Sequence, residues 1–104
     1  MISQFDVVPN PVAQARKIRP FYLSLQDRQL DHLRTRIMAP LLAAGARNEP
    51  NRLNPQFQIE ERRVYLDPTD LVTMHVRHLG SPVANLQQEH YRIVSALDLV
   101  FTGV

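Results

Sequence analysis

Hydrophobic and polar residues alternate over short stretches between residues 3 and 79, as they do in β-strands that bury one face. In the stretch Phe21 to Leu25, for example, the side chains of Phe21, Leu23 and Leu25 share one face. Pro, Gly and Asp residues separate the stretches and mark turns. The pattern predicts six short strands, at residues 3–8, 21–25, 35–39, 56–60, 63–66 and 71–79. Short strands at this regular spacing indicate a small barrel or a partly open sheet.

Two longer segments between the strands predict loops. Residues 9–20 hold three prolines and a basic cluster, which is typical of a surface hairpin loop. The third strand is expected to end near Pro40. Residues 41–54 are expected to form a loop with at most one helical turn, because Gly45 and Pro50 leave too short a segment for a stable helix.

The hydrophobic period changes near the end of the chain. From Asn85 onwards the apolar residues follow steps of three, four and seven, which predicts an amphipathic helix over about residues 85–102. Asn85 is a favourable N-cap, and Gln88 completes a pair that resembles a capping box. If this helix buries Leu97 and Val100 on the sheet, Leu99, Phe101 or Val104 stays partly uncovered. Such an uncovered edge usually marks a partner surface.

Composition narrows the class of protein. The 104 residues suit one domain, expected over residues 1–104, and a chain this short gains stability from self-association. There is no cysteine, and the start of the chain lacks the features of a signal peptide, so we expect a cytoplasmic protein without a membrane span. Eleven arginines and one lysine against ten acidic residues give a formal net charge of +2. Because they are scattered, direct nucleic-acid binding is not expected, whereas an acidic peptide partner is compatible.

The candidate chemistry is sparse. His75 and His78 are expected to point to opposite faces of a strand, so they cannot hold a metal together without a bulge. Asp67 and Asp70 flank a Pro-Thr pair, which is typical of a turn stabilised by Asx hydrogen bonds. Charged residues at 60–62 indicate a hairpin whose solvated tip carries Arg62 and Arg63. No nucleophile with its base and no glycine-rich phosphate loop is evident, so no catalytic residue, metal or cofactor is expected.

Several short motifs, in compatible order along nearly the whole chain, carry a family resemblance. They are Gln4-Phe5, Tyr22 to Gln26 (YLSLQ), Leu30-Asp31, Arg36 to Leu41 (RIMAPL), Asp70-Leu71, Gly80 with Val83 to Leu86 (VANL), and the ending Leu97 to Val104 (LDLVFTGV). With these motifs the chain resembles the CcdB toxins of bacterial toxin–antitoxin modules. The loop lengths near residues 9–20 and 41–54 differ from the family pattern.

The resemblance implies a mainly β fold, a small SH3-like barrel with a C-terminal α-helix similar to MazF and Kid, that forms a homodimer. It implies a toxin that is not an enzyme: the dimer enters the cavity of the DNA gyrase A-subunit dimer and traps gyrase on cleaved DNA, and a CcdA-like antitoxin reverses this. Carried over position by position, the gyrase-binding residues would be Gln29, Leu30, Asp98, Phe101, Thr102, Gly103 and Val104.

Three of these positions depart from the family pattern. Thr102 stands where the pattern has Trp, Asp98 where it has Asn, and Gln29 where it has Ile. A buried aromatic anchor is worth about 2–4 kcal/mol, so its loss could weaken binding thirtyfold or more. Two alternatives stay open. Analogy of fold allows an mRNA interferase, and the departures allow a non-toxic homologue that keeps the dimer and the antitoxin contact.

Overall fold

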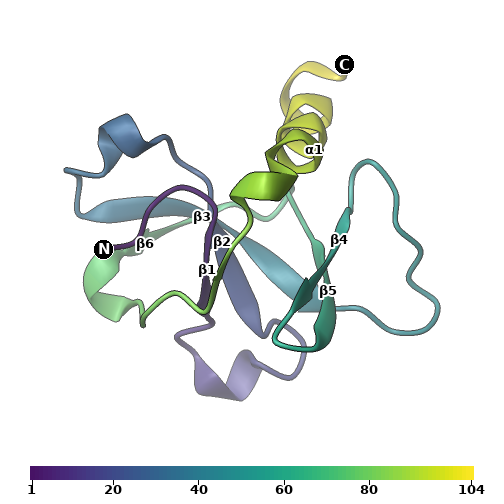
Figure 1. The fold of residues 1–104 in the computed structure, drawn as a ribbon, viewed down its shortest axis with the longest axis horizontal. Coiled ribbons are helices and arrows are strands. Elements are labelled where there is room, and N and C mark those ends of the chain that lie inside the picture. Colours follow the sequence, from purple (N-terminus) through teal and green to yellow (C-terminus); the bar gives the residue numbers. More distant parts are fainter.

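A computed structural model describes residues 1–104 and shows a sheet of seven strands with one α-helix near the C-terminus (Figure 1). The strands are β1 (Asp6–Pro9), β2 (Phe21–Ser24), β3 (Thr35–Ala43), β4 (Gln56–Ile59), β5 (Arg62–Leu66), β6 (Val72–His75) and β7 (Ala84–Asn85). The helix α1 comprises His90–Thr102. Short 3-10 turns are η1 (Ala13–Ala15), η2 (Arg28–Leu30), η3 (Val76–His78) and η4 (Gln87–Glu89).

All strand pairs are antiparallel, in the order β4-β5-β3-β2-β1-β7, and β6 pairs with β3 beside β5. The sheet curls into a nearly closed barrel, with α1 lying over one end of it (Figure 1). The prediction of a mainly β barrel with one C-terminal helix is confirmed.

The long strand β3 pairs with three other strands, and its length differs from two predictions. It does not end near Pro40 but continues to Ala43, so the expected loop begins only after residue 43. One edge of β3 pairs with β2, while the other pairs first with β6 and then with β5. Pro40 lies where the partner changes from β6 to β5, and its carbonyl accepts from the backbone of Asp67. A proline is tolerated here because no partner strand needs its missing N–H.

The main core lies inside the barrel. Alternating residues of β1 and β2 meet residues of β3, β4 and β5 there, and Ile93 and Ala96 of α1 close one end. Phe21, Leu23 and Leu25 belong to this core, as the alternation predicts. The intervening residues point to the other face of the sheet and form a smaller cluster of Ile2, Val8, Tyr22 and Met38.

The hairpin of β4 and β5 turns at Glu60 and Glu61, which corrects the predicted tip at Arg62. Ile59 pairs with Arg62, so the loop has two residues, and Arg62 and Arg63 already belong to β5. Both glutamates have positive φ, 48° and 68°. That is the backbone of a type I′ turn, which favours Asn and Gly and is strained for glutamate.

The predicted strand over residues 71–79 is wrong in its second half. β6 ends at His75, and the chain then forms η3, where the His75 Nδ1 accepts from the backbone of Arg77. The turn brings the rings of His75 and His78 together, edge to face, with centroids 6.3 Å apart. The expectation that these rings point to opposite faces is therefore wrong, because it assumed an uninterrupted strand.

The helix starts later than its apolar pattern indicates. Asn85 ends β7, and its Oδ1 accepts from the N–H of Gln87 at the start of η4, so Asn85 does not cap α1. No side chain caps the start of α1 at Glu89, and the predicted reciprocal contact of Gln88 does not form. At 13 residues α1 is the longest helix, and the structure contains no helix with the length and hydropathy needed to cross a membrane.

Candidate binding surface at the C-terminal helix

The second half of α1 extends beyond the sheet and leaves the core. Ile93 and Ala96 are fully buried, and Leu97 packs against the same core at its edge. From Asp98 onwards each side chain is half-buried or exposed. In Figure 1 this end of the helix, drawn in yellow, projects away from the barrel. The expected partly uncovered apolar edge is therefore present at the tip of the helix.

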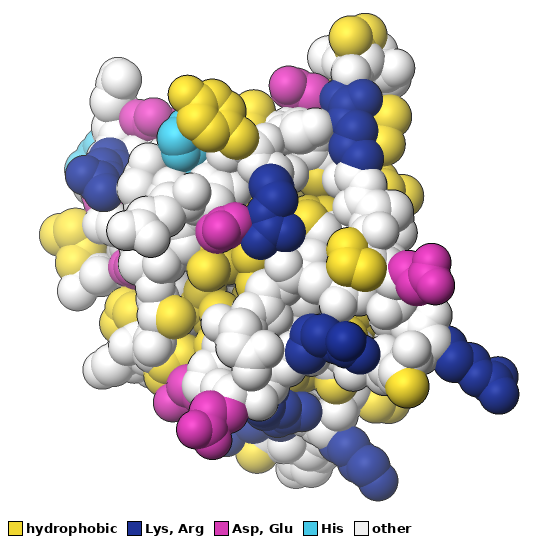
Figure 2. Space-filling view, turned by 45° about the vertical axis from the view of Figure 1, so that its right-hand side comes forward, with side chains coloured by type: hydrophobic (Ala, Val, Ile, Leu, Met, Phe, Trp, Pro, Cys, Tyr) yellow, Lys and Arg dark blue, Asp and Glu magenta, His cyan; other side chains and the backbone are white.

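Two large apolar side chains at this tip face solvent. Phe101 is 68% exposed and Val104 is 79% exposed. Figure 2 shows hydrophobic side chains at the end of the helix beside basic and acidic ones. Exposing a phenylalanine and a valine this far costs hydration free energy without any gain in packing. The tip therefore has the composition of a contact surface for another molecule.

The backbone at the tip ends in a defined cap. Gly103 adopts the left-handed conformation with φ 72°, and its N–H donates to the Leu99 carbonyl at 3.2 Å. Only glycine takes this conformation without steric cost, so Gly103 lets the chain leave the helix axis. The Thr102 hydroxyl donates to the Asp98 carbonyl at 2.7 Å and accepts from the N–H of Val104 at 3.3 Å.

Gln29 and Leu30, the other sequence-predicted contact residues, lie in η2. The Asp27 Oδ1 accepts from the N–H of Gln29 at 2.8 Å and so caps this turn. Leu30 is 41% exposed. Within one chain η2, drawn in blue in Figure 1, lies well apart from the tip of α1. The structure therefore does not bring these two groups of predicted contact residues together.

A buried arginine fixes the segment that follows η2. Arg36 is 2% exposed, and its guanidinium donates to the carbonyls of Ile2, Asp31, Leu33 and Thr35 at 2.7–3.1 Å. No carboxylate pairs with it, so backbone dipoles alone stabilise the buried charge. This network holds the N-terminus, the end of η2 and the start of β3 in one arrangement.

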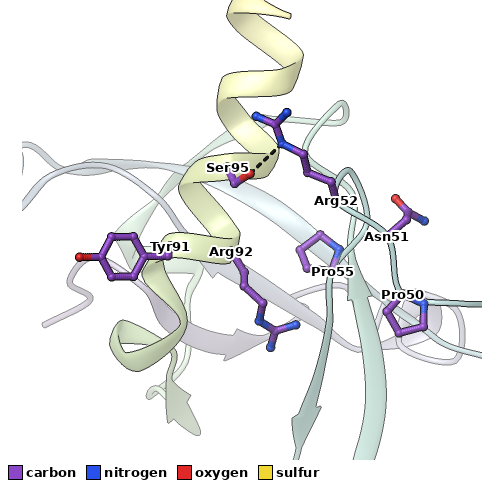
Figure 3. Close-up of a pocket in the computed structure, with 7 residues that line it drawn as sticks. All are labelled: Pro50, Asn51, Arg52, Pro55, Tyr91, Arg92 and Ser95. Atoms are coloured by element: carbon purple, nitrogen blue, oxygen red, sulfur yellow. Dashed lines mark hydrogen bonds between the residues drawn. The ribbon is translucent and has the colours of Figure 1, made fainter. Parts of the chain in front are cut away.

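Sequence reasoning missed the contact of Arg52 with α1. Arg52 lies in the loop between β3 and β4, and its Nε donates to the Ser95 Oγ at 2.7 Å (Figure 3). Its Nη2 donates to a backbone oxygen of Val104. The residues are far apart along the chain, and no motif in the sequence links them. A cleft of about 360 Å³ lies beside this contact, lined by Pro50, Asn51, Arg52, Pro55, Tyr91, Arg92 and Ser95.

Arg92, which also lines this cleft, links α1 to β4. Its guanidinium contacts Glu89 Oε2 at 2.6–2.7 Å and the Gln56 carbonyl at 3.0 Å, and it stacks 4.5 Å from the centre of the Phe57 ring. These contacts fix α1 against β4 through cation–π and charge-assisted hydrogen bonds.

The titratable groups with shifted pKa values lie away from the tip. The pKa of Arg19 is raised by the neighbouring Tyr22 side chain and by the Asp70 carboxylate, 3.0 Å away. The pKa of His75 is lowered by desolvation and by the positive charge of Arg77.

The predicted Asx turn is present, since the Asp67 Oδ1 accepts from both the N–H and the hydroxyl of Thr69. The geometry at the tip suits binding and offers no pair of nucleophile and base.

Comparison with known protein families gives one match. The family model described as CcdB protein matches residues 4–103, which is nearly the whole chain. No curated protein sequence matches the chain significantly.

Proposed function

Because the chain belongs to the CcdB family, we propose that it is a toxin that binds the A subunit of DNA gyrase and poisons the enzyme. CcdB family toxins are gyrase poisons and not enzymes. A CcdA-like antitoxin is the proposed partner that neutralises the toxin. The family match and the fold support this proposal together, since the matched residues include both the barrel and the helix.

The observation that carries the proposal is the exposed apolar tip of α1. The proposed gyrase contacts there are Asp98, Phe101, Thr102, Gly103 and Val104. Phe101 is the proposed anchor, because exposed aromatic side chains that become buried contribute most of the free energy of many interfaces. Gly103 supports the contact by fixing the direction in which the chain leaves the helix.

A homodimer is part of the proposal. A two-fold symmetric toxin presents two copies of the tip, and a two-fold gyrase A cavity receives both copies with equivalent contacts. Gln29 and Leu30, distant from the tip in one chain, supply the remaining proposed contacts from η2.

The charge distribution fits an acidic, flexible antitoxin. The chain has a sequence pI of about 9.5, and the face seen in Figure 2 carries several separate basic side chains. An acidic disordered peptide is attracted to such a surface and orders when it binds. The cytoplasm, where gyrase acts, is the proposed location.

The test compares wild-type protein with Phe101→Ala and with Val12→Ala, a matched truncation of an exposed apolar residue in the loop after β1. Expression in a gyrase-sensitive host should arrest growth with DNA breaks for wild type and Val12→Ala. Phe101→Ala should be tolerated, with binding to purified gyrase A reduced about thirtyfold or more.

Other outcomes assign the protein to the alternatives. RNA cleavage without DNA damage would indicate an mRNA interferase. Harmless expression of a folded protein that still binds the product of a neighbouring antitoxin gene would indicate a non-toxic homologue, which the departures at Asp98 and Thr102 favour over an interferase.

A further inference from the structure

The tip of α1 needs a support outside the helix. Its last residues are exposed, and the hydrogen bonds of Thr102 and Gly103 stay within the final turn. Helix ends without tertiary packing fray readily. A frayed tip would have to be ordered again on binding, at a cost in affinity.

Arg52 supplies the hydrogen bonds that join the tip to the rest of the protein. One guanidinium reaches two points, the Ser95 hydroxyl of α1 through Nε and a backbone oxygen of Val104 through Nη2. Ser95 lies within the packed part of the helix, whereas Val104 lies beyond its end. Figure 3 shows Arg52 crossing from its loop to the helix at Ser95. The planar fork of arginine donates in two fixed directions, which lysine cannot reproduce.

The loop that carries Arg52 is itself well fixed. The Asn51 Oδ1 accepts from the N–H of Asn54 at 2.8 Å, and the Asn54 side chain donates to the Leu66 carbonyl of β5 at 3.0 Å. Pro50 and Pro55 flank the turn and restrict its backbone. Arg52 therefore extends from a rigid segment that is attached to the barrel.

We propose that Arg52 is a positioning residue, which holds the Gly103-Val104 end in the conformation that gyrase A binds. The inference rests on the proposed function and deepens it. The contact is solvent-exposed, so its effect is moderate: loss of the arginine lowers the affinity for gyrase A about fivefold. The stability of the barrel does not depend on it, because Arg52 is exposed and belongs to neither core cluster.

The experiment compares Arg52→Ala with Arg47→Ala. Arg47 is exposed in the same loop and makes no side-chain hydrogen bond or ion pair, so both variants lose the same charge. Two quantities are measured: the order of the Gly103 and Val104 amides by 15N relaxation in the free protein, and the dissociation constant for purified gyrase A. Arg52→Ala should lower the order of both amides and weaken binding about fivefold, while Arg47→Ala changes neither. Thermal unfolding should be equal in all three proteins.

The conservative variant Arg52→Lys separates geometry from charge. It keeps the charge but not the fork, so it should recover less than half of the lost affinity. Unchanged order of the two amides in Arg52→Ala, equal loss of affinity in both alanine variants, or full recovery by lysine would each overturn the proposal. If the wild-type protein does not bind gyrase A, the proposed function fails, and the relaxation data alone decide whether Arg52 positions the chain end.

Discussion

At the residue scale, Thr102 shows how a departure from the family pattern can be accommodated locally. Its hydroxyl donates to the Asp98 carbonyl and accepts from the N–H of Val104, so it satisfies two backbone groups where the helix ends. This gain is local to the protein, because a threonine offers little apolar area to a partner. Thr102 thus stabilises the end of the helix but is a weak anchor for a binding partner.

Thr102→Trp should therefore strengthen binding to gyrase A. A tryptophan at this exposed position adds a second aromatic beside Phe101, and the expected gain is about thirtyfold in the dissociation constant, measured by calorimetry with purified gyrase A. Thr102→Val is the control, since it removes the hydroxyl but adds no aromatic area. Equal affinity of the tryptophan and valine variants would show that position 102 does not contact gyrase.

At the element scale, the β4–β5 hairpin carries a turn that its sequence does not favour. Glu60 and Glu61 both have positive φ, and their like charges are adjacent. The double change Glu60→Asn and Glu61→Gly should raise the free energy of unfolding by about 1 kcal/mol, because asparagine followed by glycine adopts this turn with little strain. Urea denaturation measures the change.

The control for the hairpin is the double change Glu60→Gln and Glu61→Gln, which removes both charges and keeps the side-chain size. If this variant is as stable as the Asn-Gly variant, charge repulsion and not backbone strain is the source of the instability. If neither is more stable than wild type, the turn is not strained in solution.

The elements themselves were predictable where the residue pattern reports burial directly. The alternation of Phe21, Leu23 and Leu25 identified a strand and its buried face, and the helical period identified α1. The errors fall where pairing partners decide the outcome. Pro40 continues a strand because β3 changes partner beside it, and no local sequence rule contains that information.

The start of α1 illustrates a second kind of error. Asn85 is a good capping residue, and it does accept a hydrogen bond from Gln87, but Gln87 begins η4 and not α1. The backbone of Asn85 is committed to pairing with Asp6 of β1. Because β7 pairs with β1, the helix begins several residues after the start of its apolar period in the sequence.

At the scale of the whole molecule, the candidate site combines parts that the sequence keeps apart. The exposure of Phe101 and Val104 could be expected from the apolar pattern alone. The contact of Arg52 with Val104 could not, because it depends on the path of the β3–β4 loop, which brings residue 52 beside α1. The separation of η2 from the tip of α1 also appears only in the fold.

This separation bears on how the proposed dimer is built. A dimer that covered the tip of α1 would hide the proposed gyrase contacts, so its interface must lie elsewhere. Leu33, which follows η2, and Ile37 in β3 are 44% and 42% exposed. We propose that these two uncovered apolar side chains form part of the dimer interface, because pairing through them would place both copies of η2 near the two-fold axis.

Ile37→Asp should therefore dissociate the dimer. A carboxylate at the centre of an apolar interface is desolvated without a partner, so dimer affinity should fall about 100-fold. Light scattering after size-exclusion chromatography over a dilution series measures the change. Ile18→Asp is the matched control, because Ile18 is 68% exposed in the loop between β1 and β2. If both variants dimerise as wild type does, the interface does not include β3, and the proposed position of η2 near the axis is wrong.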